Sequence, residues 1–223
     1  MDQTINNELF QACANGELQK VKECLQNGAD VNYCNGDGRT SLARASKRGY
    51  EDIVKVLLEN GANVSIRNKD NDTALMAAAK HGHKSICELL VNAGANVNDH
   101  DNEGRTALMR AALLGENQVV EYLISAGCKI DDIDNKGRTA LMDAIVAFKI
   151  DVVHYLLSKG ADVNKKDNEG CTCLMRAAYG GYTDLAIYLI NRGADKTIKD
   201  NYGKTALDYV TDKGNTELIN TLK

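Results

Sequence analysis

The stretch that decides the fold runs from Asp101 to Asp131 and reads DNEGRTALMRAALLGENQVVEYLISAGCKID. Its core, Gly-x-Thr-x-Leu, recurs along the chain at a constant step of 33 residues, with no insertion or deletion between copies. A fixed period of this size is typical of a stacked array, in which each repeat is one small structural unit. The copies begin at Gly38, Asn71, Gly104, Gly137, Gly170 and Gly203.

Within this repeat, the residue types predict a polar turn followed by two short helices. Asp101 and Gly104 favour a tight reversal, because Asp can bond its own backbone and Gly accepts positive φ. Thr106 is placed to cap a first helix over about 107–114, and a second helix is expected over about 117–125. Isolated helices shorter than roughly 12 residues are marginal in water, so each repeat must gain its stability by stacking on its neighbours.

The repeat resembles that of ankyrin-repeat proteins, whose pattern contains D-x-x-G-x-T-P-L-H and ends in G-A-D-V-N. Residues 59–65, 92–98 and 158–164 match the end of this pattern closely. The resemblance implies an all-α ankyrin-repeat solenoid of helix-turn-helix units with short β-hairpin-like turns. The chain has no Pro, and Thr-Pro-Leu-His reads Thr-Ala-Leu-Met in three repeats and Thr-Cys-Leu-Met at 172–175. Since Met lacks the hydrogen bonds of the family's His, we expect packing to replace them.

We predict a single ankyrin-repeat domain over residues 1–223. Polar residues in its first and last units predict an N-terminal and a C-terminal cap, which a stacked array requires at its ends. With both caps present, we expect a complete stand-alone scaffold. The seven predicted repeats cover about 1–34, 35–68, 69–101, 102–134, 135–167, 168–200 and 201–223.

Two repeats depart from the common pattern at places where the other repeats have Gly. Asn71 is a mild change, since Asn tolerates the left-handed region. Phe148 is a larger one and predicts a longer or redirected end of the first helix. Local repacking and an apolar patch kept for a partner are both open interpretations. Five other repeats have Gly at the position equivalent to Phe148, at residues 16, 49, 82, 115 and 181.

The composition excludes several classes of protein. Of the 223 residues, 43% are hydrophobic, and the formal net charge is −4. No apolar run reaches the roughly 18–20 residues of a membrane span, and the N-terminus lacks the basic start and apolar core of a signal peptide. Most of the seven Cys fall at apolar or small-residue places, as expected for free buried thiols in a reducing compartment. We therefore expect a cytoplasmic protein that has no membrane contact.

No motif in the chain predicts catalysis. Nucleotide-binding Gly-x-Gly-x-x-Gly and Walker motifs are absent from the sequence. The pairs His81/His83 and Cys171/Cys173 offer metal-ligating atoms, but structural zinc requires four ligands at familiar spacings. A solenoid also lacks the deep pocket that would perturb an acid–base pair. We expect a non-catalytic monomer without metal or cofactor.

The family resemblance implies that partners bind a concave face, formed by the turn tips and the exposed side of the first helices. The positions that map onto this face carry 13 basic and seven acidic side chains, whereas the whole chain has a net charge of −4. We expect a basic face that attracts an acidic partner and an acidic back, although such charges also simply keep a protein in solution. The basic positions are Arg39, Arg44, Lys47, Arg48, Lys69, Lys80, Arg105, Arg110, Lys136, Arg138, Arg176, Lys204 and Lys213, and the acidic ones are Asp37, Asp70, Asp72, Glu103, Asp143, Glu169 and Asp212.

Apolar side chains are expected on the same face, and exposed apolar clusters are typical of contact sites. Tyr and Arg are also enriched among the residues that dominate binding energies. We predict that an apolar strip flanked by Arg binds an unidentified protein or peptide with acidic residues. The candidate partner-binding residues are Arg44, Lys47, Arg48, Arg105, Arg110, Leu113, Leu114, Arg138, Val146, Arg176, Tyr179 and Tyr209.

Two alternatives are open. The basic face could bind nucleic acid or another polyanion, because Arg and Lys neutralise phosphate and Tyr stacks on bases. The sequence pI of about 5.6 argues against this, since dedicated nucleic-acid-binding domains are usually basic. The chain could also be a structural scaffold that has no single partner.

Overall fold

The computed structural model describes residues 3–210 and 215–223. In these residues the only β-pairing is an isolated bridge between Cys34 and Thr40, so the fold is all-α, as predicted. The helices are α1 (Gln3–Asn15), α2 (Leu18–Gln26), α3 (Ser41–Arg48), α4 (Glu51–Glu59), α5 (Ala74–Lys80), α6 (Lys84–Asn92), α7 (Ala107–Leu114), α8 (Asn117–Ser125), α9 (Ala140–Val146), α10 (Ile150–Ser158), α11 (Cys173–Gly180), α12 (Thr183–Asn191), the 3-10 helix η1 (Leu207–Tyr209) and α13 (Thr216–Leu222).

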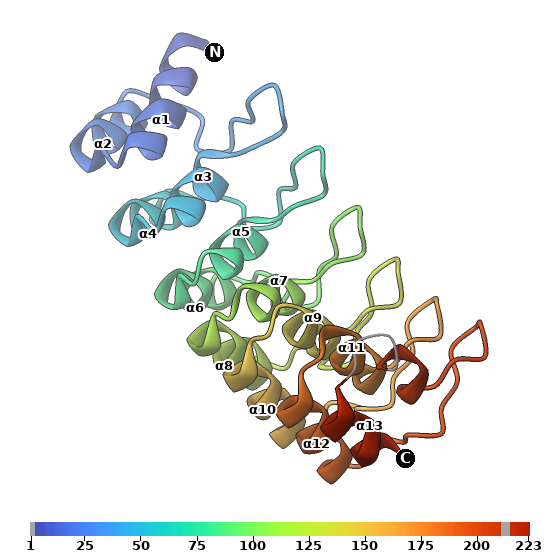
Figure 1. Ribbon diagram of the computed structural model, residues 1–223. Coiled ribbons are helices and arrows are strands. Elements are labelled where there is room, and N and C mark those ends of the chain that lie inside the picture. The colour runs from blue at the N-terminus through green and yellow to red at the C-terminus, as the bar shows by residue number, and fades with distance from the viewer. Residues whose placement is uncertain (1–2, 211–214) are drawn as a thin grey trace. The chain divides into compact units, whose positions relative to one another are not determined.

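The chain divides into two compact units. Unit 1 comprises residues 1–111 and 118–128, and unit 2 comprises residues 112–117 and 129–223, so the boundary falls within the fourth repeat. Within each unit, a repeat places its first helix beside its second helix, and its turn projects to one side (Figure 1). The assignment of all repeats to one domain stays a prediction.

Each first α-helix that follows a turn begins after a Thr, as the sequence predicts, whereas the 3-10 helix η1 of the last repeat has no such cap. The hydroxyl of this Thr accepts a hydrogen bond from the backbone amide three residues later, at 3.1–3.4 Å. The bond satisfies one of the amides that a helix leaves unpaired at its N-terminus. The capping residues are Thr40, Thr73, Thr106, Thr139 and Thr172.

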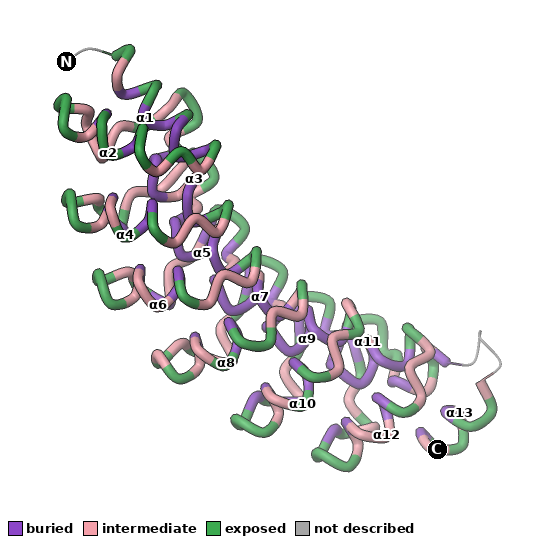
Figure 2. Tube along the Cα trace, turned by 90° about the vertical axis from the view of Figure 1, so that its left-hand side faces the viewer, coloured by how far each residue is buried: buried purple, intermediate pink, exposed green. Residues whose placement is uncertain are grey.

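The helix faces that meet within each unit form its core. The Leu two residues after each capping Thr is 1% exposed, and the Ala three residues further on is fully buried. Small Ala side chains let neighbouring first helices approach closely, and aliphatic residues of the second helices fill the remaining space. Figure 2 shows these buried positions along the first helices, with exposed loops at the far ends of the second helices.

The Met side chains at the place of the family's His are at most 2% exposed, so they pack in the core as expected. The expectation that they form no hydrogen bond is wrong for Met175. Its Sδ accepts from the backbone amide of Thr172 at 3.4 Å, because the thioether is a weak acceptor that lies directly over the start of α11.

The residue that opens each turn holds the turn together. One side-chain oxygen of this Asp or Asn accepts hydrogen bonds from the backbone amides two and four residues later, at 2.8–3.0 Å. The backbone amide of the same residue donates to the carbonyl four residues later, at 2.9–3.1 Å, so each turn closes through this side chain and a backbone hydrogen bond together. The opening residues are Asn35, Asn68, Asp101, Asp134, Asp167 and Asp200.

Phe148 does not lengthen its helix, so that expectation is wrong. Helix α9 ends at Val146, and Phe148 adopts a φ of 54°, the left-handed conformation that Gly16, Gly49 and Gly115 adopt in other repeats. The backbone geometry of the repeat therefore prevails over the residue type. A bulky residue in this region is strained by about 1–3 kcal/mol.

Tyr182, from the next repeat, is the neighbour that packs around Phe148. In other repeats the equivalent neighbour covers the Gly, since a Cβ on Gly16 would lie 2.9 Å from the Tyr50 ring and one on Gly49 would lie 2.6 Å from the His83 ring. Tyr182 instead lies beside the Phe148 ring, with centroids 4.5 Å apart, and over Gly180, whose added Cβ would be 2.6 Å from the Tyr182 ring. Gly180 therefore supplies the space that Phe148 takes away.

We predict that Gly180→Ala lowers the free energy of unfolding by about 1–3 kcal/mol through overpacking against Tyr182. A Gly to Ala change in a helix ordinarily raises the free energy of unfolding, so a decrease would indicate that the contact with Tyr182 dominates. In the double variant Phe148→Gly/Gly180→Ala, Tyr182 can return over residue 148, and most of the loss should disappear. Urea unfolding of the four proteins measures this coupling, and strictly additive effects would contradict it.

Candidate functional site

One helix position differs in residue type between repeats, and in three of them its side chain contacts the residue that opens the turn. It lies nine residues after the residue that opens the turn, on the first-helix face predicted to bind partners. Where the turn opens with Asn, this position is Arg44 or Ala77. Where the turn opens with Asp, it is Arg110, Asp143, Arg176 or Tyr209. The Asp residues bring a negative charge on a second, buried oxygen, whereas the partly exposed Asn35 and Asn68 end in a neutral amide group.

In unit 1, Arg110 forms ion pairs with both Asp101 and Asp72. The side chain of Asp101 is 4% exposed and that of Arg110 is 16% exposed, so this pair is largely removed from water. A buried carboxylate without a partner is strongly unfavourable. Arg110 therefore balances a charge inside the chain.

In unit 2, Arg176 and Arg138 do the same. Arg176 pairs with the buried Asp167, and with Glu169 at 3.3 Å. Arg138 donates to Oδ2 of Asp134 from Nε at 3.0 Å and from Nη2 at 2.8 Å, and it lies 3.9 Å from the buried Asp143. Burial of Asp134 favours its protonated form, but hydrogen bonds from the backbone and side chain of Arg138 outweigh this and lower the pKa of Asp134.

Tyr209 takes the same role in the last repeat. Its hydroxyl donates to Oδ2 of Asp200, and this hydrogen bond lowers the pKa of Asp200 and raises the pKa of Tyr209. These helix residues were predicted as part of the face, but the aspartates that open the turns were not. The nine-residue spacing from Asp to Arg at 101/110 and at 167/176 was a signal for two of the four, whereas Asp134 pairs with Arg138 and Asp200 with Tyr209.

The basic residues of α3 and α5 in unit 1 differ from these arginines. In the described part of the chain, no ion pair is formed by Arg44, Lys47 and Arg48 of α3 or by Lys80 of α5. Three basic residues and one acidic residue line a cavity of about 100 Å³, namely Arg39, Arg44, Lys47 and Asp72. Partial burial, and then the charges of Arg44 and Arg39, lower the pKa of Lys47. The cluster therefore carries excess positive charge.

The apolar residues predicted for the face lie in unit 2. Leu114, Val146 and Tyr179 have exposed fractions of 42%, 53% and 62%, and Leu113 is partly exposed. The ring of Tyr179 meets that of Tyr209 edge to face, with centroids 6.2 Å apart. Arg105 is partly exposed at its turn, and its backbone amide donates to Asp101. Asp212 and Lys213 lie outside the described residues.

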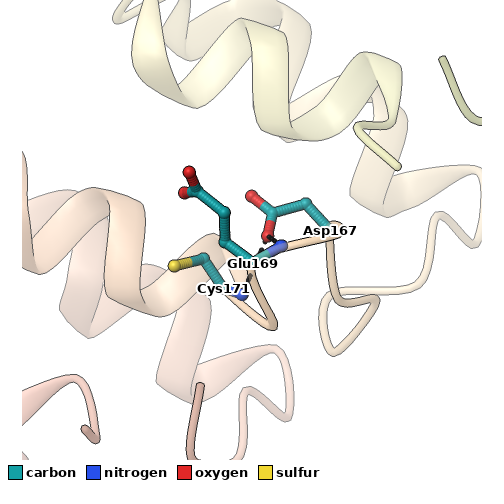
Figure 3. Close-up of side chains that lie close together, drawn as sticks. All are labelled: Asp167, Glu169 and Cys171. Atoms are coloured by element: carbon teal, nitrogen blue, oxygen red, sulfur yellow. Dashed lines mark hydrogen bonds between the residues drawn. The ribbon is translucent and has the colours of Figure 1, made fainter. Parts of the chain in front are cut away.

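Figure 3 shows a group that could be mistaken for a metal site, formed by Asp167, Glu169 and Cys171. Their ligand atoms lie within 4.8 Å of one another. Oδ1 of Asp167 already accepts from the amides of Glu169 and Cys171, and the guanidinium of Arg176 contacts both carboxylates. Burial raises the pKa of the Cys171 thiol, which disfavours the thiolate that a metal requires. The chain's own cation occupies this site.

Comparisons with known proteins agree with this architecture. A family model of three ankyrin repeats matches residues 9–101, 60–134 and 94–167, and a model of many ankyrin repeats matches residues 156–210. The chain therefore belongs to the ankyrin-repeat family, whose repeats are protein–protein interaction modules. The crystal structure of the human ASB11 ankyrin repeat domain is similar, with a TM-score of 0.88 and 26% identity over 96% of this chain and 97% of that one. No curated protein matches the chain in sequence.

We predict that Arg110→Ala lowers the free energy of unfolding by about 2 kcal/mol, because it leaves Asp101 buried without its cation. Arg44→Ala is the matched control, with the same change at the same helix position but opposite Asn35. It should alter stability by less than about 0.5 kcal/mol. Chemical denaturation measures both variants, and equal losses would show that the turn carboxylate does not determine the effect.

Acid unfolding gives a second prediction. A carboxylate whose pKa is lowered on folding stabilises the protein above its unfolded pKa of about 3.9, and this contribution is lost as pH falls through the folded pKa. Asp134→Asn should therefore be less stable than the wild type at neutral pH, and the difference should shrink towards zero near pH 2. Thermal unfolding across this range tests it, and a difference independent of pH would contradict it.

Proposed function

We propose that this protein is a non-catalytic binding module that contacts a partner protein or peptide through its first-helix face. The observation that supports this most directly is the strip of Leu114, Val146 and Tyr179 in unit 2, which stays substantially exposed. Leaving such side chains in water forgoes the free energy of their burial. Exposed apolar clusters of this kind are typical of contact sites.

The arginines of the face are proposed to divide between two roles. Arg110, Arg138 and Arg176 balance turn carboxylates, so their first role is to position the turns beside the binding face. A partner's acidic group would have to compete with these internal partners. The unpaired cluster of Arg44, Lys47 and Arg48 in unit 1 faces no such competition, and we propose it as the place where an acidic group binds.

A polyanion is the second candidate, because this unpaired cluster favours it. The cluster is small, however, and the arginines further along the chain are neutralised by buried aspartates. The overall charge of −4 also opposes association with a nucleic acid. A single acidic side chain of a protein partner therefore fits the charges of unit 1 better than a polymer of phosphates does.

The cysteines and the helix lengths bear on the cellular setting in which the protein acts. All seven Cys are free thiols and five of them are buried, which supports a reducing, cytoplasmic environment. In the described part of the chain, no helix combines the length and the apolar character that crossing a membrane requires. We also propose that the chain acts as a monomer and without a cofactor.

The experiment that tests the function is capture of partners from native lysate by the purified protein at increasing salt. We expect a protein to be retained by the wild type at moderate salt and lost by Leu114→Ser/Val146→Ser/Tyr179→Ser, because the strip is its main contact. Ile133→Ser is the control, since Ile133 is an apolar side chain of unit 2 that is 46% exposed outside the strip.

Other outcomes would change the proposal in defined ways. Retention that is unaffected by the triple variant would exclude the strip as the binding site. Retention of nucleic acid that is lost at modest salt and abolished by Arg44→Gln/Lys47→Gln would favour the polyanion.

A further inference from the structure

The strain at Phe148 is not offset by burial. Its ring is 52% exposed, although the residue adopts a left-handed conformation that Gly adopts without cost in other repeats. A strained residue that is mostly solvent-exposed contributes little to a core. Backbone outliers of this kind are found preferentially at binding sites, where the strained conformation directs a side chain towards a ligand.

The Phe148 ring lies at the edge of a hollow in unit 2 between α10 and α12, which lie side by side in both views (Figure 1, Figure 2). Two aromatic pairs line it. Phe148 and Tyr182 have centroids 4.5 Å apart, and His154 and Tyr188 have centroids 4.3 Å apart. The hollow has a volume of about 640 Å³, enough for a small molecule or a long side chain.

Phe148 contributes to this hollow in two ways. It supplies one aromatic ring directly, and that ring packs against Tyr182, which also lies over Gly180. In unit 1, where Gly16 occupies the equivalent position, Tyr50 is the one aromatic residue of the corresponding hollow, whose volume is about 330 Å³. The aromatic lining is therefore a property of this repeat and not of the repeat pattern.

The charges of the lining indicate which ligand it suits. Among the described residues that line it, Asp184 is the one carboxylate, and there is neither Lys nor Arg. Aromatic faces attract cations, with Tyr and Phe effective within about 6 Å of the centroid. One of these rings already has such a partner in the chain, because the guanidinium of Arg192 lies 5.1 Å from the centroid of Tyr188, and a bound cation must share that ring with it.

We propose that the hollow lined by Phe148, Tyr182, His154 and Tyr188 binds an organic cation, either an alkylammonium or a guanidinium group. The ring faces contact the cation and its carbon substituents, and the Asp184 carboxylate balances its charge. The hollow lies against the second helices, whereas the proposed partner strip lies on the first helices. The site is therefore independent of the proposed function and is tested separately.

The test uses choline and its carbon analogue, in which a neutral tert-butyl group replaces trimethylammonium. The two probes have nearly the same shape, so the comparison isolates the charge. Titrations followed by two-dimensional amide NMR should give saturable shifts at Gly181, Thr183 and Tyr188 with choline. The neutral analogue should bind roughly tenfold more weakly or not at all. Methylguanidinium, titrated in the same way, distinguishes the two cation classes.

Phe148→Gly separates a binding role from a structural one. Gly relieves the strained φ, so this variant should unfold at the same temperature as the wild type or higher, while its choline affinity falls roughly tenfold. Tyr188→Leu should also lose choline binding, and Tyr202→Leu is the control, since Tyr202 is a 78% exposed aromatic residue that does not line the hollow.

Three results would overturn the proposal. The first is equal binding of choline and its neutral analogue, which would show an apolar groove only. The second is the absence of saturable shifts with either cation. The third is a Phe148→Gly variant that binds choline as the wild type does, because the strained residue would then have no part in the site.

Discussion

Every turn of this protein depends on the side chain that opens it. One oxygen of that Asp or Asn accepts two backbone amides and closes the turn, which positions the following Thr to cap the first helix. The turn then contributes to the stack through a second contact. The backbone amide of Asn168 donates to the Lys136 carbonyl of the preceding turn at 2.9 Å, and its side chain donates to the Asn135 carbonyl at 2.9 Å. Helices of seven to nine residues are thereby held by their neighbours.

The choice between Asp and Asn at that position determines the electrostatics of the surface. Asn35 and Asn68 close their turns without adding a charge. Asp101, Asp134, Asp167 and Asp200 close theirs equally well but leave a buried second oxygen, which Arg110, Arg138, Arg176 and Tyr209 respectively satisfy. The basic residues that the sequence predicts on one face therefore fall into two groups in the structure. One neutralises the interior of the turns, and the other, around Arg44 and Lys47, is available to a partner.

Phe148 shows how firmly the repeat geometry is imposed. The left-handed position after the first helix is retained even with a side chain that resists it, because the surrounding stack determines the backbone. The consequence appears in the neighbouring repeat, where Tyr182 rests on Gly180. An irregularity in one repeat is thus accommodated by a small residue in the next, and an aromatic hollow results.

The sequence by itself determined the repeat, the helix pairs, their caps and the all-α ankyrin fold. These features depend on local chemistry and on a period that one chain displays six times, so a pattern suffices to predict them. The Gly-to-Asn change at 71 was also predictable, because Asn tolerates a φ of 63°. The tertiary structure alone decided which charges are paired, that Phe148 keeps the left-handed position, and where Tyr182 lies. Those outcomes depend on contacts between residues four to 38 positions apart, whose side-chain directions a sequence pattern does not specify.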